Sequence, residues 1–105
     1  MGLPEAVANA AVKGDTRAVT AWLDEGGDMD ARCADSSDTT LLIGAAITGK
    51  AEMVRMLLQR GASINLQNAN GGTALLAAAT GGHTTIVQAL LDAKADATLQ
   101  TNSGE

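Results

Sequence analysis

The chain has 105 residues, of which 46% are hydrophobic, 18% charged and 1% aromatic. This length fits one domain, and the hydrophobic fraction is too high for a disordered segment. Seven Lys and Arg stand against twelve Asp and Glu, and the net charge of −5 argues against nucleic-acid binding, which needs clustered cations. No apolar run is long enough to predict a membrane span, and the first residues lack the pattern of a secretion signal.

The negative charge is concentrated in the first half of the chain. Residues 1–49 carry three Lys and Arg against eight Asp and Glu, whereas residues 50–105 carry four of each. An acidic half favours a basic partner, although an ordinary solvated surface is the commoner explanation. Cys33 is the single cysteine, so no internal disulfide can form. We therefore expect an intracellular setting, either cytoplasmic or nuclear.

The sequence is built from three copies of one unit. Residues 40–67 align with residues 73–100 at a shift of 33, and 11 of the 28 positions are identical. A third copy lies upstream at a shift of 35, where residues 10–26 align with residues 45–61. The two additional residues fall in the segment Ala31–Ala34, where a loop can absorb them. Such a period is typical of repeat architectures.

Each copy predicts two short helices followed by an extended hairpin. Thr40 and Thr73 precede apolar runs and can cap the first helix, and Gly49 and Gly82 mark its end. The second helix carries apolar pairs spaced three to four residues apart, which share one helical face. In chain order we expect helices near 4–13, 16–25, 41–48, 51–60, 74–81 and 84–93. Turn-forming residues predict the hairpin over residues 63–72.

The unit resembles the ankyrin repeat, whose pattern is G-x-T-P-L-H-x-A-A-x-x-G-H with the exit G-A-x-V-N. Gly71–His83 matches the first part and Gly61–Asn65 the exit, although Leu41 and Ala74 replace the family's Pro. The resemblance spans residues 4–105. It implies an all-α solenoid of helix-turn-helix units with β-hairpin-like loops, in a single domain over residues 1–105. The repeats are about 4–37, 38–70 and 71–103, and the chain stops as a fourth would begin.

The resemblance also implies a non-catalytic, protein-binding module without a cofactor, which uses the hairpin tips and the concave face of the first helices. The partner is an unidentified protein, with no nucleic acid or membrane. Carried over by position, the expected surface consists of Ser36, Ser37, Thr39, Ile47, Thr48, Ala69, Asn70, Gly72, Thr80 and Gly81. Nearby, only Arg32 is a residue type that commonly anchors interfaces. Two alternatives stay open: a docking arm of a larger enzyme, and an engineered or evolved scaffold without a specific partner.

Motifs that imitate catalytic or metal sites fail in detail. The segment Gly44–Ala51 resembles a phosphate-binding loop, but it ends in Ala where a hydroxyl is needed, and no strand precedes it. The acidic series from Asp24 fails as a calcium loop, because Arg32 stands where a ligand is required. One His and one Cys cannot build a four-ligand zinc site. The resemblance instead implies that His83 packs and hydrogen-bonds at the turn between helices.

Three further expectations concern individual positions. Trp22 aligns with Leu57 and Leu90 and is expected in the core. Lys94 stands where Gly26 and Gly61 end the other second helices, so we expect a left-handed, strained backbone there. The third repeat keeps the apolar pattern of an internal one, although terminal repeats normally carry a polar outer face. We therefore expect a monomer with weak self-association through its C-terminal face.

Overall fold

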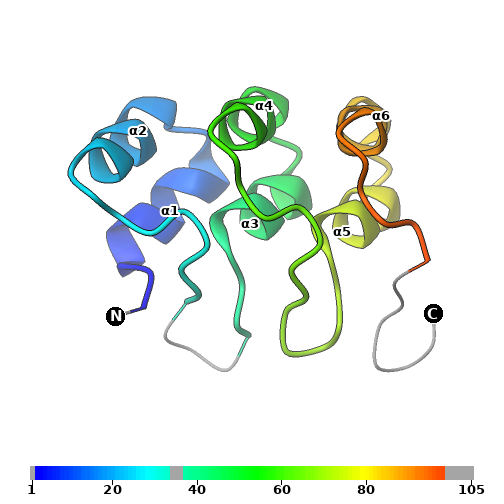
Figure 1. Ribbon diagram of the computed structural model, residues 1–105, viewed down its shortest axis with the longest axis horizontal. Coiled ribbons are helices and arrows are strands. Elements are labelled where there is room, and N and C mark those ends of the chain that lie inside the picture. The colour runs from blue at the N-terminus through cyan, green and yellow to red at the C-terminus, as the bar shows by residue number, and fades with distance from the viewer. Residues whose placement is uncertain (1, 34–36, 99–105) are drawn as a thin grey trace.

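A computed structural model describes residues 2–33 and 37–98 (Figure 1). These residues form helices α1 (Glu5–Lys13), α2 (Thr16–Asp24), α3 (Leu41–Thr48), α4 (Ala51–Gln59), α5 (Ala74–Thr80) and α6 (Thr84–Asp92). All six expected helices are confirmed, and each bound agrees within one residue. The all-α repeat fold is thereby confirmed. No helix in the described residues is long and apolar enough to cross a membrane.

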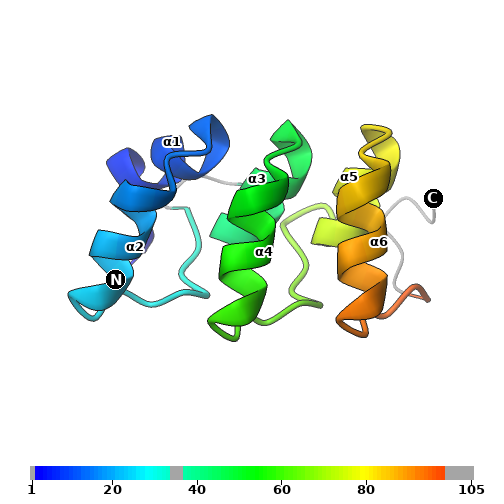
Figure 2. The same ribbon diagram turned by 90° about the horizontal axis from the view of Figure 1, so that it is seen from above.

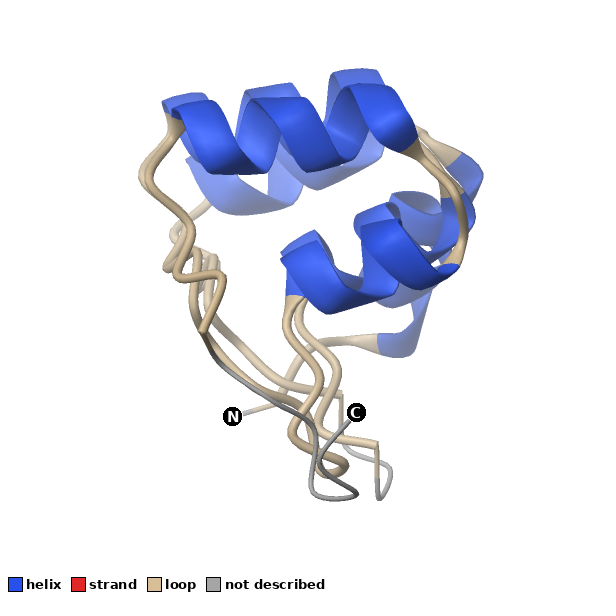
Figure 3. Ribbon diagram, turned by 90° about the vertical axis from the view of Figure 1, so that its right-hand side faces the viewer, coloured by secondary structure: helices blue, strands red, loops and turns tan. Residues whose placement is uncertain are grey.

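The helices form two parallel layers. The first helix of each pair (α1, α3, α5) lies in one row, and the second helix (α2, α4, α6) lies in another row above it (Figure 1). Figure 2 shows α2, α4 and α6 side by side. The long loops leave the helical layers on one side and extend below the row of first helices (Figure 3). The first helices and the loops therefore share the inner, concave side of the stack.

Threonine hydroxyls begin the first helices as the sequence predicts. The Thr40 Oγ1 accepts from the Ile43 amide at 3.3 Å, and the Thr73 Oγ1 accepts from the Leu76 amide at 3.2 Å. Each bond satisfies one of the amides left without a partner in a first helical turn. Gly49 ends α3 with φ 76°, a left-handed conformation that glycine adopts without strain.

The core lies between the two layers and between neighbouring repeats. Ala45 and Ala78 have no exposed surface, and small side chains at these positions let successive first helices approach closely. Met53 is buried, as expected. Trp22 packs against the core but is only half-buried, whereas the equivalent Leu57 and Leu90 are fully buried.

The loops have the shape of hairpins, but the described residues contain no β-strand beyond one isolated bridge between Leu3 and Cys33. In the second loop, the Asn68 amide donates to the Gly72 carbonyl at 2.8 Å, while the Asn68 Oδ1 accepts from the amides of Asn70 and Gly72. The expected hairpin is thus closed by main-chain bonds between Asn68 and residues 71 and 72, together with the Asn68 side chain, and it has no strand pairing.

Hydrogen bonds from side chains link successive long loops to one another. The Asp30 carboxylate accepts from the Ser63 amide at 2.9 Å and from its hydroxyl at 2.6 Å. One repeat later, the Asn65 Oδ1 accepts from the Asp96 amide at 2.8 Å. Asp30 and Asn65 occupy equivalent positions. Neighbouring repeats are therefore held together by a recurring bond outside the apolar core.

Among residues 2–33 and 37–98, two residues other than glycine have a left-handed backbone. Lys94 has φ 74°, in the same region as Gly26 at 98° and Gly61 at 90°, so the expected conformation at Lys94 is confirmed. The second residue is Asp38, with φ 53° in the first long loop, a conformation that was not expected from the sequence. Asp tolerates this region better than Lys does, because its short polar side chain can bond locally.

Candidate functional site

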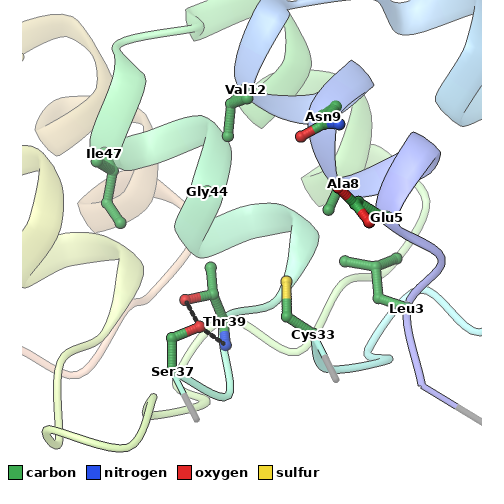
Figure 4. Close-up of a pocket in the computed structure, with 10 residues that line it drawn as sticks. All are labelled: Leu3, Glu5, Ala8, Asn9, Val12, Cys33, Ser37, Thr39, Gly44 and Ile47. Carbon is green, nitrogen blue, oxygen red and sulfur yellow. Dashed lines mark hydrogen bonds between the residues drawn. The ribbon is translucent and has the colours of Figure 1, made fainter. Parts of the chain in front are cut away.

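The concave side carries a first groove between α1, α3 and the first long loop (Figure 4). Its volume is about 610 Å³. Aliphatic side chains dominate its walls, and hydroxyls from the loop close one side. It is lined by Leu3, Glu5, Ala8, Asn9, Val12, Cys33, Ser37, Thr39, Gly44 and Ile47.

A second groove follows directly, between α3, α5 and the second long loop, with a volume of about 430 Å³. Amides and hydroxyls are more prominent here than in the first groove. It is lined by Ile47, Asn68, Asn70, Gly72, Thr73, Leu76, Ala77, Thr80 and Gly81. Ile47 belongs to both linings and is half exposed, at 50%. It therefore forms the ridge that separates the two grooves.

The repeat periodicity explains why the grooves lie next to each other. Val12, Ile47 and Thr80 occupy equivalent positions near the ends of successive first helices. Val12 and Ile47 remain exposed, at 37% and 50%, although they are large and aliphatic. Gly44 lies between them, and a Cβ built there would meet the Val12 Cγ1 at 3.5 Å, an ordinary contact. Gly44 thus brings no side chain into the space between Val12 and Ile47.

Most of the residues expected from the sequence line these grooves. Ser37, Thr39 and Ile47 line the first groove. The second groove is lined by Ile47, Asn70, Gly72, Thr80 and Gly81.

The other expected residues lie apart. Thr48 is exposed outside both linings, and its hydroxyl donates to the Gly44 carbonyl at 3.0 Å. Ala69 is exposed at the loop tip, where its amide donates to the Ser37 carbonyl at 2.9 Å. Ser36 falls outside the described residues. The partner-binding role of the whole set stays a prediction.

One wall of the first groove was missed. The side chains of Glu5, Ala8, Asn9 and Val12 come from α1, and the sequence analysis took surface residues only from the second and third repeats and the first loop. A signal was available, because the shift of 35 that defines the first repeat places Val12 at the position of Ile47. Extending the expected surface by one repeat would have included this wall.

The polar groups of the grooves differ in what they bond. The Ser37 Oγ accepts from the Thr39 amide at 3.3 Å and from the Thr39 hydroxyl at 3.0 Å (Figure 4). In the second groove, the Asn70 carboxamide and the Thr80 hydroxyl make no side-chain hydrogen bond with any residue that the structure describes. These two groups are available to a ligand.

Arg32 has a different role from the one expected. Its Nη1 donates to the Asp38 carbonyl at 3.0 Å and to the Gln67 carbonyl at 2.7 Å. These carbonyls belong to the first and second long loops. The guanidinium therefore links the two loops, and its Nη1 is not an anchor held ready for a partner.

Neither catalytic chemistry nor metal binding gains support from the arrangement. The Nε2 of His83 lies 3.2 Å from the Ile47 carbonyl, which can only accept, so Nε2 carries the donated proton. The expected packing and bonding of His83 is thereby confirmed. Cys33 lines the first groove, whereas His83 is not among the lining residues of either groove. Among the described residues, no three His, Cys, Asp or Glu side chains come together in a way that could hold a metal ion.

Comparison with known proteins decides the family. The family model for ankyrin repeats matches residues 7–101 in three copies. The chain belongs to the ankyrin-repeat family. Ankyrin repeats generally mediate protein–protein interactions, and members of the family are typically not enzymes.

The relatives are much longer proteins. The ankyrin-repeat chain is 38% identical over 71 residues to the ankyrin repeat and KH domain-containing protein mask-1 of Caenorhabditis elegans, covering 68% of the chain and 3% of that protein. It is 37% identical over 79 residues to the SH3 and multiple ankyrin repeat domains protein 1 of Homo sapiens, covering 75% of the chain and 4% of the relative. The chain therefore spans only a small fraction of the length of these relatives.

Proposed function

We propose that this ankyrin-repeat chain binds a protein partner in the two grooves of its concave side, without catalysing a reaction. The observation that carries the proposal is the shared ridge at Ile47. Two neighbouring grooves, with volumes of about 610 and 430 Å³, form one continuous surface on which an aliphatic side chain stays half exposed. Exposed apolar groups rimmed by polar residues mark interaction sites.

The names of the relatives favour a binding role over a docking arm of an enzyme. They combine ankyrin repeats with KH or SH3 domains, and none of these names states an enzymatic activity. Val12 and Ile47, exposed in adjacent repeats and rimmed by polar groove residues, favour a partner over a scaffold without one. An intracellular setting remains part of the proposal and rests on the single cysteine.

Affinity capture with variants of the grooves tests the proposal. Ile47→Glu places a charge on the ridge, and a triple variant at Ser37, Asn70 and Thr80 with bulky or charged replacements changes both linings. Each should abolish capture of a specific partner identified by mass spectrometry. Circular dichroism should stay unchanged, because all four side chains are at least partly exposed.

Matched controls lie on the outer helices. Gln59 on α4 and Gln88 on α6 are exposed and lie outside both linings. Charged substitutions there should leave capture intact. Equal loss of capture from the outer variants would place the interface elsewhere and contradict the proposal.

A second proposed contact is weak self-association of the monomer through its C-terminal face. Ala46 and Val54 of the second repeat have no exposed surface, because the third repeat covers them. Their equivalents Ala79 and Val87 are exposed and half-buried, respectively, and Leu91 is 41% exposed. Covering a few hundred Å² of such surface, at about 25 cal/mol per Å², offers several kcal/mol before association entropy is subtracted, enough only for a weak contact.

A further inference from the structure

We infer that the first groove accepts an aliphatic side chain from an extended peptide segment in which the next residue is Lys or Arg. This inference rests on the proposed function and adds the chemistry of the partner. The inference is based on a difference between the two ends of the groove, one of which is apolar and the other charged. Figure 4 shows Ile47 at one end and Glu5 beside Leu3 at the other, with Gly44 between them.

The apolar part of the groove fits an aliphatic side chain. Ala8, Val12 and Ile47 line it, and Gly44, which has no side chain, forms part of its floor. Covering the exposed parts of Val12 and Ile47 would remove them from water, which is the main source of affinity in such a contact.

The charged part of the groove fits a cation. Glu5 is exposed and carries the only full charge among the described residues that line the two grooves. Asp38 is exposed on the loop, between the lining residues Ser37 and Thr39. The Arg32 guanidinium donates to the Asp38 carbonyl and keeps its positive charge, so it offsets the charge of Asp38, whereas neither Arg32 nor Lys13 is part of the lining beside Glu5. A basic residue of the partner would therefore be attracted by Glu5, and an acidic one would be repelled by it.

The neighbouring groove indicates that the segment is extended. Beyond the ridge at Ile47, the lining residues that the structure describes in the second groove carry no charge, but they include the Asn70 carboxamide and the Thr80 hydroxyl. An Asn carboxamide can donate to and accept from the same peptide unit, which makes it suited to a main chain without internal hydrogen bonds. A segment lying across both grooves would use the carboxamide of Asn70 in this way.

Fluorescence anisotropy with three labelled nonapeptides tests the inference. All have Gly and Ser flanks, and they differ only in two central residues, which are Leu-Arg, Leu-Glu or Ser-Arg. The Leu-Arg peptide should bind the intact protein most tightly. Replacing Leu by Ser should weaken binding about tenfold or more, since an aliphatic side chain is lost. Replacing Arg by Glu should weaken it about fivefold or more in low salt, and this difference should shrink in 0.5 M salt, at about a 4 Å Debye length.

Variants of the protein locate the contact. Glu5→Gln should lower the affinity for the Leu-Arg peptide about two- to fivefold and leave the affinity for the Leu-Glu peptide unchanged or higher. Glu52→Gln on the outer helix α4 is the matched control, because both acids lie in the first turn of a helix and lose the same helix-dipole contribution. Gly44→Leu fills the groove floor and should abolish binding of the Leu-Arg and Leu-Glu peptides, while helicity is retained.

Three results would overturn the inference. They are equal binding of the Leu-Arg and Leu-Glu peptides, unchanged binding by Gly44→Leu, and no binding of any peptide at about 1 mM, the limit of weak recognition. None of these results contradicts the proposed function. That proposal fails if the Ile47→Glu variant captures the partner as well as the parent protein does.

Discussion

Gly27 lies directly against the indole of Trp22, so that a Cβ built at Gly27 would come within 2.4 Å of the Trp22 Cδ2. The Gly27 amide also donates to the Trp22 carbonyl at 3.0 Å, which fixes the turn after α2 over the ring. In the second and third repeats, the equivalent pairs are Leu57 with Ala62 and Leu90 with Ala95. The larger core side chain is thus paired with glycine and the smaller one with alanine.

We expect Gly27→Ala to destabilise the fold by about 1–3 kcal/mol, because its methyl would overlap the indole and force a shift. Urea denaturation measures the change. In the Trp22→Leu background the same substitution recreates the Leu–Ala pair of the other repeats, so its cost should largely disappear. If the losses of stability from Gly27→Ala and Trp22→Leu simply add in the double variant, the indole is not the cause of the Gly27→Ala loss.

Lys94→Gly should stabilise the fold. At φ 74° the Lys94 Cβ approaches the following carbonyl, a strain of roughly 1–2 kcal/mol that glycine avoids. For a chain of this size, a gain of 1 kcal/mol corresponds to a rise in Tm of roughly 4–8 °C. Lys94→Ala is the control, since it removes the same charge but keeps the Cβ, and it should gain little. A neutral or lower Tm for Lys94→Gly would refute the strain.

The pKa of Asp96 is held below its ordinary value, first by the Thr98 hydroxyl and then by the Thr98 amide, both of which donate to its carboxylate. The folded-state pKa is therefore lower than the unfolded-state pKa. The stabilising contribution is complete above the unfolded value of about 3.9 and is lost as the pH falls through the lower folded value.

NMR titration of the Asp96 carboxyl carbon measures this shift. Thr98→Ala removes the hydroxyl and keeps the amide, so the pKa should rise part of the way toward its ordinary value. Asp96→Asn should weaken the dependence of stability on pH in this acidic range. A Thr98→Ala titration identical to that of the parent protein would exclude the hydroxyl as the main cause.

Light scattering across a concentration series tests the proposed self-association. The average mass should rise above the monomer value of 10.5 kDa as the protein approaches about 1 mM. Leu91→Lys places a charge on the C-terminal face and should suppress the rise, whereas Thr85→Lys, at an exposed position on the same helix, tests the effect of charge alone. A constant monomer mass at the highest concentration would contradict the exposed apolar contact.

The helices were predictable from the sequence because local signals and repeat spacing agree there. The Thr40 and Thr73 hydroxyls cap their helices as expected, and the apolar spacing predicts which faces are buried. Lys94 was also predictable, since aligned glycines show what its backbone must do. These features depend on residues close in the chain or on direct comparison between the copies.

The grooves were only partly predictable because they depend on which side chains bond across repeats. Arg32 is 35 residues from Gln67, and nothing local indicates that its guanidinium would link two loops. The α1 wall was missed because the first copy differs most from the other two, so its equivalence to α3 carries fewer identities. The left-handed Asp38 was as predictable as Lys94, because at the shift of 33 it aligns with Gly71, whose φ is 82°, but this pair was not compared.

Because Ile47 lines both grooves, the rotamer of its side chain affects the shape of both. A β-branched side chain has few stable positions, so a ligand that fixes one of them from the first groove also sets the width of the second. Occupancy of the two grooves is then thermodynamically linked, and the linkage acts equally in both directions. A partner that fills both grooves with Ile47 in one rotamer gains affinity from each contact. Two separate ligands that require different rotamers of Ile47 exclude each other.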